Sequence, residues 1–361
     1  MTTPVSPDDV DRRAGKPMAG PLSVAKIATS SEMPVLLMLS RRLITPVYRA
    51  AFLVAASSSG MLGWLAKRPC DLETLADKLG IDDTGPLRVW LDIGVRLSVL
   101  DFRDGCYRLR SRSAKLLARV RHDASAAALE EVLRYHVPAL LNAPEMLREG
   151  RRFSLSDQDG TVIARSTRVV EPFVHMALDR VVPRSGPVRL LEVGCGSGVH
   201  VRHAASLNPH LTALAIDMQT DVVKHAMENM AEWGLEDRVE VRESDLRTLE
   251  SGARFDLITL HNSIYYFAEE ERVQALARAR GLLTPGGRLV LTTACQGGHV
   301  SLDMLNLWLE CADFGGPLPH ERDLVDQLRE AGFAEVTASQ VIPGEQFRAF
   351  VGTNERAPAR A

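Results

Sequence analysis

The stretch "LLEVGCGSGVH", from Leu190 to His200, constrains the fold of this chain more than any other. An apolar run ends in three glycines at alternate positions, Gly194, Gly196 and Gly198, and a helical pattern follows. Glycines there allow a tight turn and let a ligand approach the backbone closely. The pattern predicts a strand, a ligand-binding turn and a helix. By itself such a turn does not distinguish a dinucleotide site from other nucleoside sites.

Short apolar runs alternate with helical patterns from residue 184 to the end of the chain. The seven predicted strands are "VRLLEVG", "LTALAID", "RVEVRES", "FDLITL", "GRLVLTT", "EVTASQVI" and "FRAFVGT". Such alternation is typical of an α/β fold with a doubly wound parallel sheet. We therefore assign residues 184–361 to one Rossmann-like, seven-stranded domain.

Acidic side chains stand at the ends of successive predicted strands. Glu192 lies two residues before the first glycine, Asp217 ends the second strand, and Asp245 follows the third. A carboxylate in the second position can hold both hydroxyls of a ribose, and one in the third can accept the exocyclic amine of an adenine. Each acid alone could be an ordinary cap or turn residue. Their order on three successive strands favours a nucleoside site.

These acids, together with "LTPGG" (283–287) before the fifth strand, resemble those of class I S-adenosylmethionine-dependent methyltransferases, over residues 188–352. The resemblance implies S-adenosyl-L-methionine as the cofactor. It places Met218 on the adenine and His261 at the methionine side. The full set that it assigns to the cofactor is Glu192, Gly194, Cys195, Gly196, Gly198, Asp217, Met218, Asp245, Leu246 and His261. The alternative, a nicotinamide-dependent dehydrogenase, is disfavoured by the acid inside the first strand, by Asp245 and by the last pair of strands.

The N-terminal half divides into three predicted segments. Residues 1–30 are rich in Pro, Gly, Ser and Asp without periodicity, which predicts a mobile tail. Residues 31–115 give helices, one between Asp71 and Gly80, and then a hairpin at Asp104-Gly105. This order is typical of a winged helix. Residues 116–183 have apolar residues at three-to-four spacing and form a helical connector.

A winged-helix-like domain followed by such a connector resembles the small-molecule O-methyltransferases of plant and bacterial secondary metabolism. The resemblance implies a homodimer formed by the N-terminal domain, with the connector lining a pocket for a small-molecule or short-peptide acceptor. The alternative is nucleic-acid binding, for which a basic run is available: Arg108, Arg110, Arg112, Lys115, Arg119 and Arg121. A net charge of −3 and the apolar Trp90 and Leu91 on the second helix argue against it.

The stretch "FDLITLHNSIYYFAEEER" (255–272) bears on the chemistry. In the family, a histidine in this region removes the acceptor's hydroxyl proton, and Tyr265 takes its position here. A tyrosine with its usual pKa of about 10 is a poor base at neutral pH. The candidate catalytic residues are therefore Tyr265, His299 and His261, while His136 and His175 lie on the connector.

The reaction that follows is a methyl transfer whose acceptor atom stays open. Oxygen is favoured by the family, while nitrogen or carbon remains plausible because of Tyr265. Two other functions are a nucleic-acid or protein methyltransferase guided by the winged helix, and a regulator that binds the cofactor without catalysis.

The cysteines and the apolar segments indicate in which cellular compartment the protein is expected. Five scattered cysteines without a CxxC pair are typical of free thiols in a reducing environment, and no metal-binding cluster is recognisable. The N-terminus has no secretory pattern, and residues 57–60 (SSSG) interrupt the most apolar run short of a bilayer span. We expect a cytoplasmic protein without a membrane segment.

Overall fold

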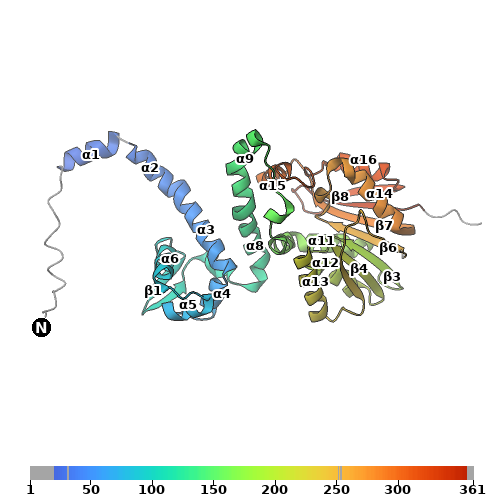
Figure 1. Ribbon diagram of the computed structural model, residues 1–361, viewed down its shortest axis with the longest axis horizontal. Helices are drawn as coiled ribbons and strands as arrows, with labels where there is room; N and C mark the ends of the chain where they lie inside the picture. The colour runs from blue at the N-terminus through green and yellow to red at the C-terminus, as the bar shows by residue number, and fades with distance from the viewer. Residues whose placement is uncertain (1–19, 31, 251, 253, 356–361) are drawn as a thin grey trace, which may run out of the picture.

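The computed structural model describes residues 20–30, 32–250, 252 and 254–355. Figure 1 shows a small N-terminal domain, a helical middle and an α/β domain in sequence along the longest axis. Residues 1–19 of the predicted tail lie outside the described residues. The rest of that segment contains helix α1, Pro21–Ser30, with the sequence "PLSVAKIATS", which the absence of periodicity did not predict.

The N-terminal domain has the predicted order of helices followed by a hairpin. After α2 (Met33–Leu39) and the turn η3 (Ser40–Ile44) come α3 (Thr45–Ser58), α4 (Met61–Lys67), α5 (Leu72–Leu79), α6 (Thr84–Arg96), β1 (Leu100–Arg103) and β2 (Cys106–Leu109). The Asp71 carboxylate accepts the Thr74 N–H and caps α5. Asp104 and Gly105 have φ of 55° and 76°, as a two-residue hairpin turn requires.

The connector is helical as predicted, with one addition. It contains α7 (Arg112–Leu117), η4 (Val120–His122), α8 (Asp123–Glu131), η5 (Val132–His136), α9 (Val137–Glu149), η6 (Leu155–Asp157), α10 (Gly160–Ser166), η7 (Thr167–Val170) and α11 (Glu171–Val181). Helix α10 was not predicted; the Asp159 carboxylate caps it by accepting the Thr161 N–H. Segment η5 is a π-turn, in which the Val137 N–H bonds to the Val132 carbonyl.

All seven predicted strands are confirmed. They are β3 (Val188–Val193), β4 (Leu211–Asp217), β5 (Val239–Glu243), β6 (Phe255–His261), β7 (Leu283–Ala294), β8 (Glu335–Gln340) and β9 (Phe347–Thr353), in the order β5-β4-β3-β6-β7-β9-β8. The prediction of a wholly parallel sheet is wrong at β9, which runs antiparallel to both neighbours. Residues 341–346 are too few for a parallel crossover, so β8 and β9 form a hairpin.

Helices cover both faces of this sheet (Figure 1). The first side has α12 (Val199–Leu207) and α13 (Thr220–Glu232), and the other has α14 (Arg272–Leu282) and α16 (Glu321–Glu330). The short turns η8 (Ile264–Tyr266) and η9 (Glu269–Glu271) follow β6. Because the chain order reverses between β3 and β6, a ligand is expected at the carboxyl ends of these strands.

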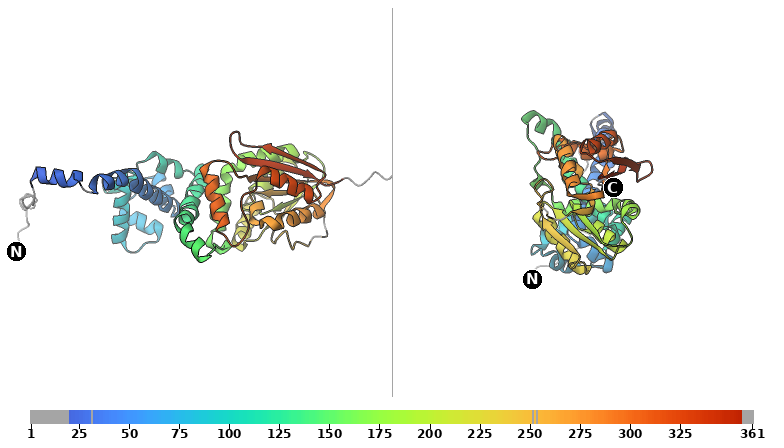
Figure 2. Two further views of the ribbon diagram at one scale, coloured as in Figure 1. Left: turned by 90° about the horizontal axis from the view of Figure 1, so that it is seen from above. Right: turned by 90° about the vertical axis from the view of Figure 1, so that its right-hand side faces the viewer.

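The connector packs over that edge of the sheet. Helix α15 (Val300–Glu310) contacts α9 and η5, and α10 contacts α13. The N-terminal helices, blue in Figure 2, extend away from the rest of the chain. None of the helices in the described part of the chain is long and apolar enough to cross a membrane.

Candidate active site

Two cavities meet above the carboxyl ends of the strands. The glycine-turn cavity, of about 390 Å³, lies at the turn after β3 and at the ends of β4 and β6. The connector cavity, of about 410 Å³, lies between the connector, η8 and α15. Both volumes are in the range of small-molecule sites. Ile163, Thr167, Asn262 and Tyr266 line both cavities, so the two join there.

The glycine turn has the backbone that the sequence predicts. Gly194, Gly196 and Gly198 have φ of 68°, 55° and 78°, values that favour glycine. Gly194 and Gly196 line the glycine-turn cavity, whereas Gly198 does not. Gly198 begins α12, and a Cβ there would lie 2.2 Å from the Met230 Cε. Its role is therefore close packing.

Acidic groups dominate the charge of the glycine-turn cavity. Its lining has four carboxylates, Asp217, Asp245, Glu271 and Asp313, and one guanidinium, Arg247. Arg247 pairs with Asp245 at 2.7 Å and with Glu271 at 3.1 Å. A dinucleotide would place a diphosphate among these carboxylates. The cavity therefore disfavours the dehydrogenase alternative and suits a cationic sulfonium instead.

Asp217 is held at the edge of the cavity by the glycine turn. Its carboxylate accepts the N–H groups of Gly196 and Gln219, both at 3.1 Å. Burial raises the pKa of Asp217, and these hydrogen bonds partly oppose the increase. Met218, which is 47% exposed, and Leu246 supply apolar surface beside it.

Glu192 and Cys195 do not line the glycine-turn cavity, although both were predicted at the cofactor. Glu192 is buried in β3, and burial raises its pKa well above the usual value. Within the described residues, its Oε1 has no hydrogen-bond partner. Burial also raises the pKa of the Cys195 thiol well above its usual value. Cys195 therefore packs beneath the turn as an unreactive thiol.

His261 lies at the end of β6 and lines the glycine-turn cavity. Its Nδ1 is 2.8 Å from the Thr292 hydroxyl, and its Nε2 is buried without a partner in the described part of the chain. Burial lowers the pKa of His261 to about 3, with His175 adding to the effect. A neutral imidazole with so low a pKa is a weak base.

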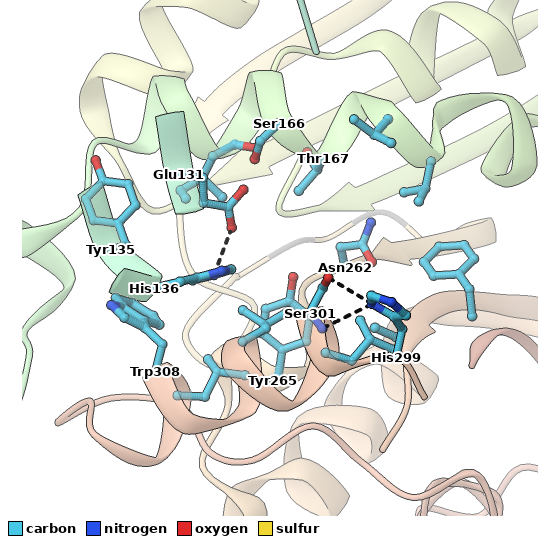
Figure 3. Close-up of a pocket in the computed structure, with 18 of the residues that line it drawn as sticks. Glu131, Tyr135, His136, Ser166, Thr167, Asn262, Tyr265, His299, Ser301 and Trp308 are labelled. Carbon is cyan, nitrogen blue, oxygen red and sulfur yellow. Dashed lines mark hydrogen bonds and ion pairs between the residues drawn. The ribbon is translucent and has the colours of Figure 1, made fainter. Parts of the chain in front are cut away.

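The connector cavity is mostly apolar, with a few polar groups facing inward. Figure 3 shows Glu131 and His136 on the connector side, and His299 and Ser301 at the start of α15. Tyr265 and Trp308 also line it. Such a cavity suits a small, apolar molecule that carries few polar groups.

Tyr265 lines the connector cavity, but its chemistry is that of a donor. Burial raises the pKa of Tyr265 well above 10, and the charges of Tyr266 and Glu131 add to this. The hydroxyl therefore stays protonated at neutral pH. Tyr266 lies in the turn η8 and lines both cavities; its hydroxyl accepts a hydrogen bond from the Gln158 amide at 3.1 Å.

His299 lines the connector cavity, and His175 lines neither cavity. The His299 Nδ1 accepts the Ser301 N–H at 3.4 Å and caps α15. A neutral imidazole that accepts at Nδ1 carries its proton on Nε2, so His299 presents a donor in this arrangement. His175 instead stacks on His203, with ring centroids 3.9 Å apart.

Several polar residues of these cavities were not predicted as site residues. Among them, Glu131 and Gln158 come from the connector, and Asn262 follows β6 with a φ of 52°. A positive φ at a residue other than glycine often marks a functional position. In the sequence, nothing marks Glu131 as a site residue except that it is an acidic residue next to the apolar face of the predicted helix "AAALEEVL".

Comparisons with known proteins agree with this geometry. A family described as "Methyltransferase domain" matches residues 191–289. The 3-hydroxy-5-methyl-1-naphthoate 3-O-methyltransferase of Streptomyces sahachiroi is 24% identical over 308 residues, which cover 81% of this chain and 88% of that protein. The solved structure of PigF with S-adenosylhomocysteine has a TM-score of 0.68 at 18% identity and covers 90% of this chain and 99% of that one.

A second solved structure, the mitomycin 7-O-methyltransferase MmcR, has a TM-score of 0.69 at 17% identity. It covers 89% of this chain and 98% of that one, so the likeness includes the N-terminal half. At these identities the structures establish the shared fold. Together with the matching domain and the acidic cavity at the glycine turn, they identify the chain as an S-adenosylmethionine-dependent methyltransferase with the fold of O-methyltransferases.

Proposed function

We propose that this enzyme transfers the methyl group of S-adenosylmethionine to a hydroxyl of a small, apolar acceptor held in the connector cavity. The observation that carries the proposal is the junction of the two cavities at Asn262 and Tyr266. A sulfonium in the glycine-turn cavity and an acceptor in the connector cavity would face each other there. A volume of about 410 Å³ favours a small molecule over a longer peptide.

The residues of the glycine-turn cavity fit the cofactor. Asp217 is proposed to hold the ribose hydroxyls, and Asp245, Leu246 and Met218 to surround the adenine. His261 and the glycine turn would bound the methionine end. Glu192 does not line this cavity, and its unpartnered Oε1 would reach the cofactor through a bridging water.

Methyl transfer from the sulfonium needs alignment more than it needs a strong base. When bound, the cofactor would supply an electrophilic methyl group: the acceptor oxygen would take the methyl carbon, the C–S electron pair would return to sulfur, and the acceptor's proton would leave to solvent. Alignment alone can supply several orders of magnitude in rate. Tyr265 is proposed to orient the acceptor by donating a hydrogen bond.

The N-terminal helices support a homodimer. Large apolar side chains on α2 and α3 are exposed, among them Leu36 at 52% and Tyr48 at 61%. Exposed apolar surface of this extent marks a protein contact, and a second copy of the chain is the proposed partner. Analytical ultracentrifugation should show a dimer, and Leu36→Glu should shift it to monomer. A wild-type monomer at micromolar concentration would contradict the proposal.

Nucleic-acid binding, the alternative function of the N-terminal domain, has less support. The outward residues of α6 include the apolar Val89 and Ile93, and Arg108 is paired with Asp104 at 3.2 Å. The cytoplasmic location expected from the composition stays a prediction.

The experiment that tests the function uses S-adenosylmethionine with a carbon-13 methyl group, incubated with the enzyme and host extract. An O-methyl NMR signal on a small molecule is expected. An N- or C-methyl signal would contradict oxygen as the acceptor, and label found only in macromolecules would favour the nucleic-acid or protein alternative. Binding of S-adenosylhomocysteine without any turnover would favour a regulator.

A further inference from the structure

The connector cavity has an unusual balance of charge. Its lining, within the described residues, contains the carboxylates Glu131 and Glu345 and no lysine or arginine. The remaining basic candidate that faces Glu131 is His136, and burial lowers its pKa. His136 is therefore neutral near pH 7. Within the described lining, an acceptor with its own carboxylate would meet no lysine or arginine, only the imidazoles of His136 and His299.

Glu131 is the deeper of the two carboxylates. Its side chain is 19% exposed, and its Oε1 lies 3.6 Å from the His136 Nε2. Figure 3 shows it pointing into the cavity beside Ser166. Burial raises the pKa of Glu131, and the nearby Ser166 hydroxyl, which donates to the Ile163 carbonyl at 3.0 Å, opposes this. The Glu345 side chain, by contrast, is exposed.

The neighbouring residue shows what Glu131 lacks. Glu130 is buried and pairs with Arg134 one turn later, at 2.8 Å. Glu131 is partly buried, and within the described residues its ion-pair partner is His136 and not an arginine. A buried carboxylate without a cation costs free energy unless donors satisfy it. The π-turn η5 immediately after Glu131 brings Tyr135 and His136 to the same cavity, and such turns are frequent at functional sites.

Glu131 also lies near the junction of the two cavities. Its charge raises the pKa of Tyr265 and of Tyr266, in each case after the larger effect of burial. Tyr266 lines both cavities, and the charge of Asp217 in the glycine-turn cavity also raises the pKa of Tyr266. A ligand group that satisfies Glu131 would therefore lie close to the reacting end of the acceptor.

We propose that Glu131 is the acceptor-recognition residue: it accepts a hydrogen bond from an O–H or N–H of the acceptor, and it makes the cavity select neutral or cationic acceptors over carboxylates. This rests on the proposed function of the connector cavity. It sets this enzyme apart from its naphthoate-methylating relative, whose acceptor is a carboxylate by name.

The first test separates host extract by charge. Fractions retained on an anion exchanger, retained on a cation exchanger, or unretained are each incubated with enzyme and methyl-labelled cofactor. Label in small molecules from the unretained or cation-exchange fractions is expected. Label mainly in the anion-exchange fraction would overturn the inference while leaving the methyltransferase function intact. The absence of any labelled small molecule would instead overturn the proposed function, and the inference with it.

The second test uses Glu131→Gln, which keeps the shape and removes the charge. With the active fraction, we expect the KM for the acceptor to rise about tenfold, as for loss of a hydrogen bond to a charged group. Affinity for S-adenosylhomocysteine should be unchanged, which a merely disruptive substitution would not allow. Glu131→Asp should restore part of the KM.

The matched control is Glu130→Gln, the same change at the adjacent residue, which does not line the cavity. It should leave the KM within about twofold of wild type, a difference below 0.5 kcal/mol. An unchanged KM in Glu131→Gln, or an equal change in both variants, would overturn the role of Glu131.

Discussion

The Asp217 carboxylate accepts the Gly196 N–H at 3.1 Å, joining the end of β4 to the glycine turn that follows β3. The two residues are 21 positions apart in the sequence and come from neighbouring parallel strands. Through this bond the acid helps to shape the cavity in which it is proposed to hold the ribose. The carboxylate and the glycine backbone thus form one unit of the proposed cofactor site.

Replacing Asp217 by alanine should remove most of the binding of S-adenosylhomocysteine. A hydrogen bond to a charged group contributes about 1.5–3 kcal/mol, so we expect the Kd to rise about 10- to 100-fold. Isothermal titration calorimetry measures this directly. Asp217→Asn keeps an acceptor for the Gly196 N–H and should lose less affinity. Unchanged affinity in the alanine variant of a folded protein would disprove the assignment of Asp217.

Tyr265→Phe removes the proposed donor and leaves the ring in place. Because the side chain is only 5% exposed, the phenylalanine should pack equally well. We expect intact S-adenosylhomocysteine binding and a decrease in kcat/KM of about tenfold, the loss of one hydrogen bond. Steady-state kinetics with the labelled acceptor would measure it. Turnover equal to wild type would mean that Tyr265 is only a packed aromatic residue of the core and does not orient the acceptor.

The sequence predicts the sheet well because most of its strands are apolar runs between helical patterns. It misses the direction of β9, since that depends on how many residues connect β8 to β9 and not on the strand's own composition. It also misses α10, whose capping residue Asp159 lies in a stretch, "SLSDQDG", with the composition of a loop.

For the site, the sequence locates the residues tied to the glycine turn but not those of the connector cavity. Gly194, Gly196 and Asp217 follow motif spacing, so the cavity they line could be predicted. Glu131 and Tyr266, by contrast, are brought together by the packing of the connector over η8. Glu192 obeys the motif and yet lies beneath the cavity, because side chains of a strand alternate between its two faces.

His299→Asn should reduce turnover by less than tenfold. The asparagine side chain can still cap α15 by accepting the Ser301 N–H, and it keeps a donor toward the cavity. In the arrangement observed, His299 presents a donor and not a base. Removing a general base typically lowers the rate by about 10²–10⁴. A loss of that size, with the KM unchanged, would make His299 the base and contradict this account.

The pH dependence of stability should carry a contribution from His261. Its pKa is about 3 in the folded protein, against 6.5 as the usual value. Between these values the unfolded chain binds one proton more than the folded chain, so the free energy of unfolding falls as the pH falls. The slope expected from one such group is about 1.4 kcal/mol per pH unit. Buried Glu192, whose pKa is raised, contributes with the opposite sign.

Urea unfolding of wild type and His261→Asn, both without cofactor, isolates this contribution between pH 6 and pH 4.5. Asparagine can keep a hydrogen bond to Thr292 and does not titrate, so the carboxylates contribute equally to both proteins. The free energy of unfolding should therefore fall less steeply in the variant, by about 1.4 kcal/mol per pH unit. Equal slopes would mean that His261 titrates in the folded protein as it does in the unfolded chain. The imidazole would then be open to water at the methionine end of the cavity.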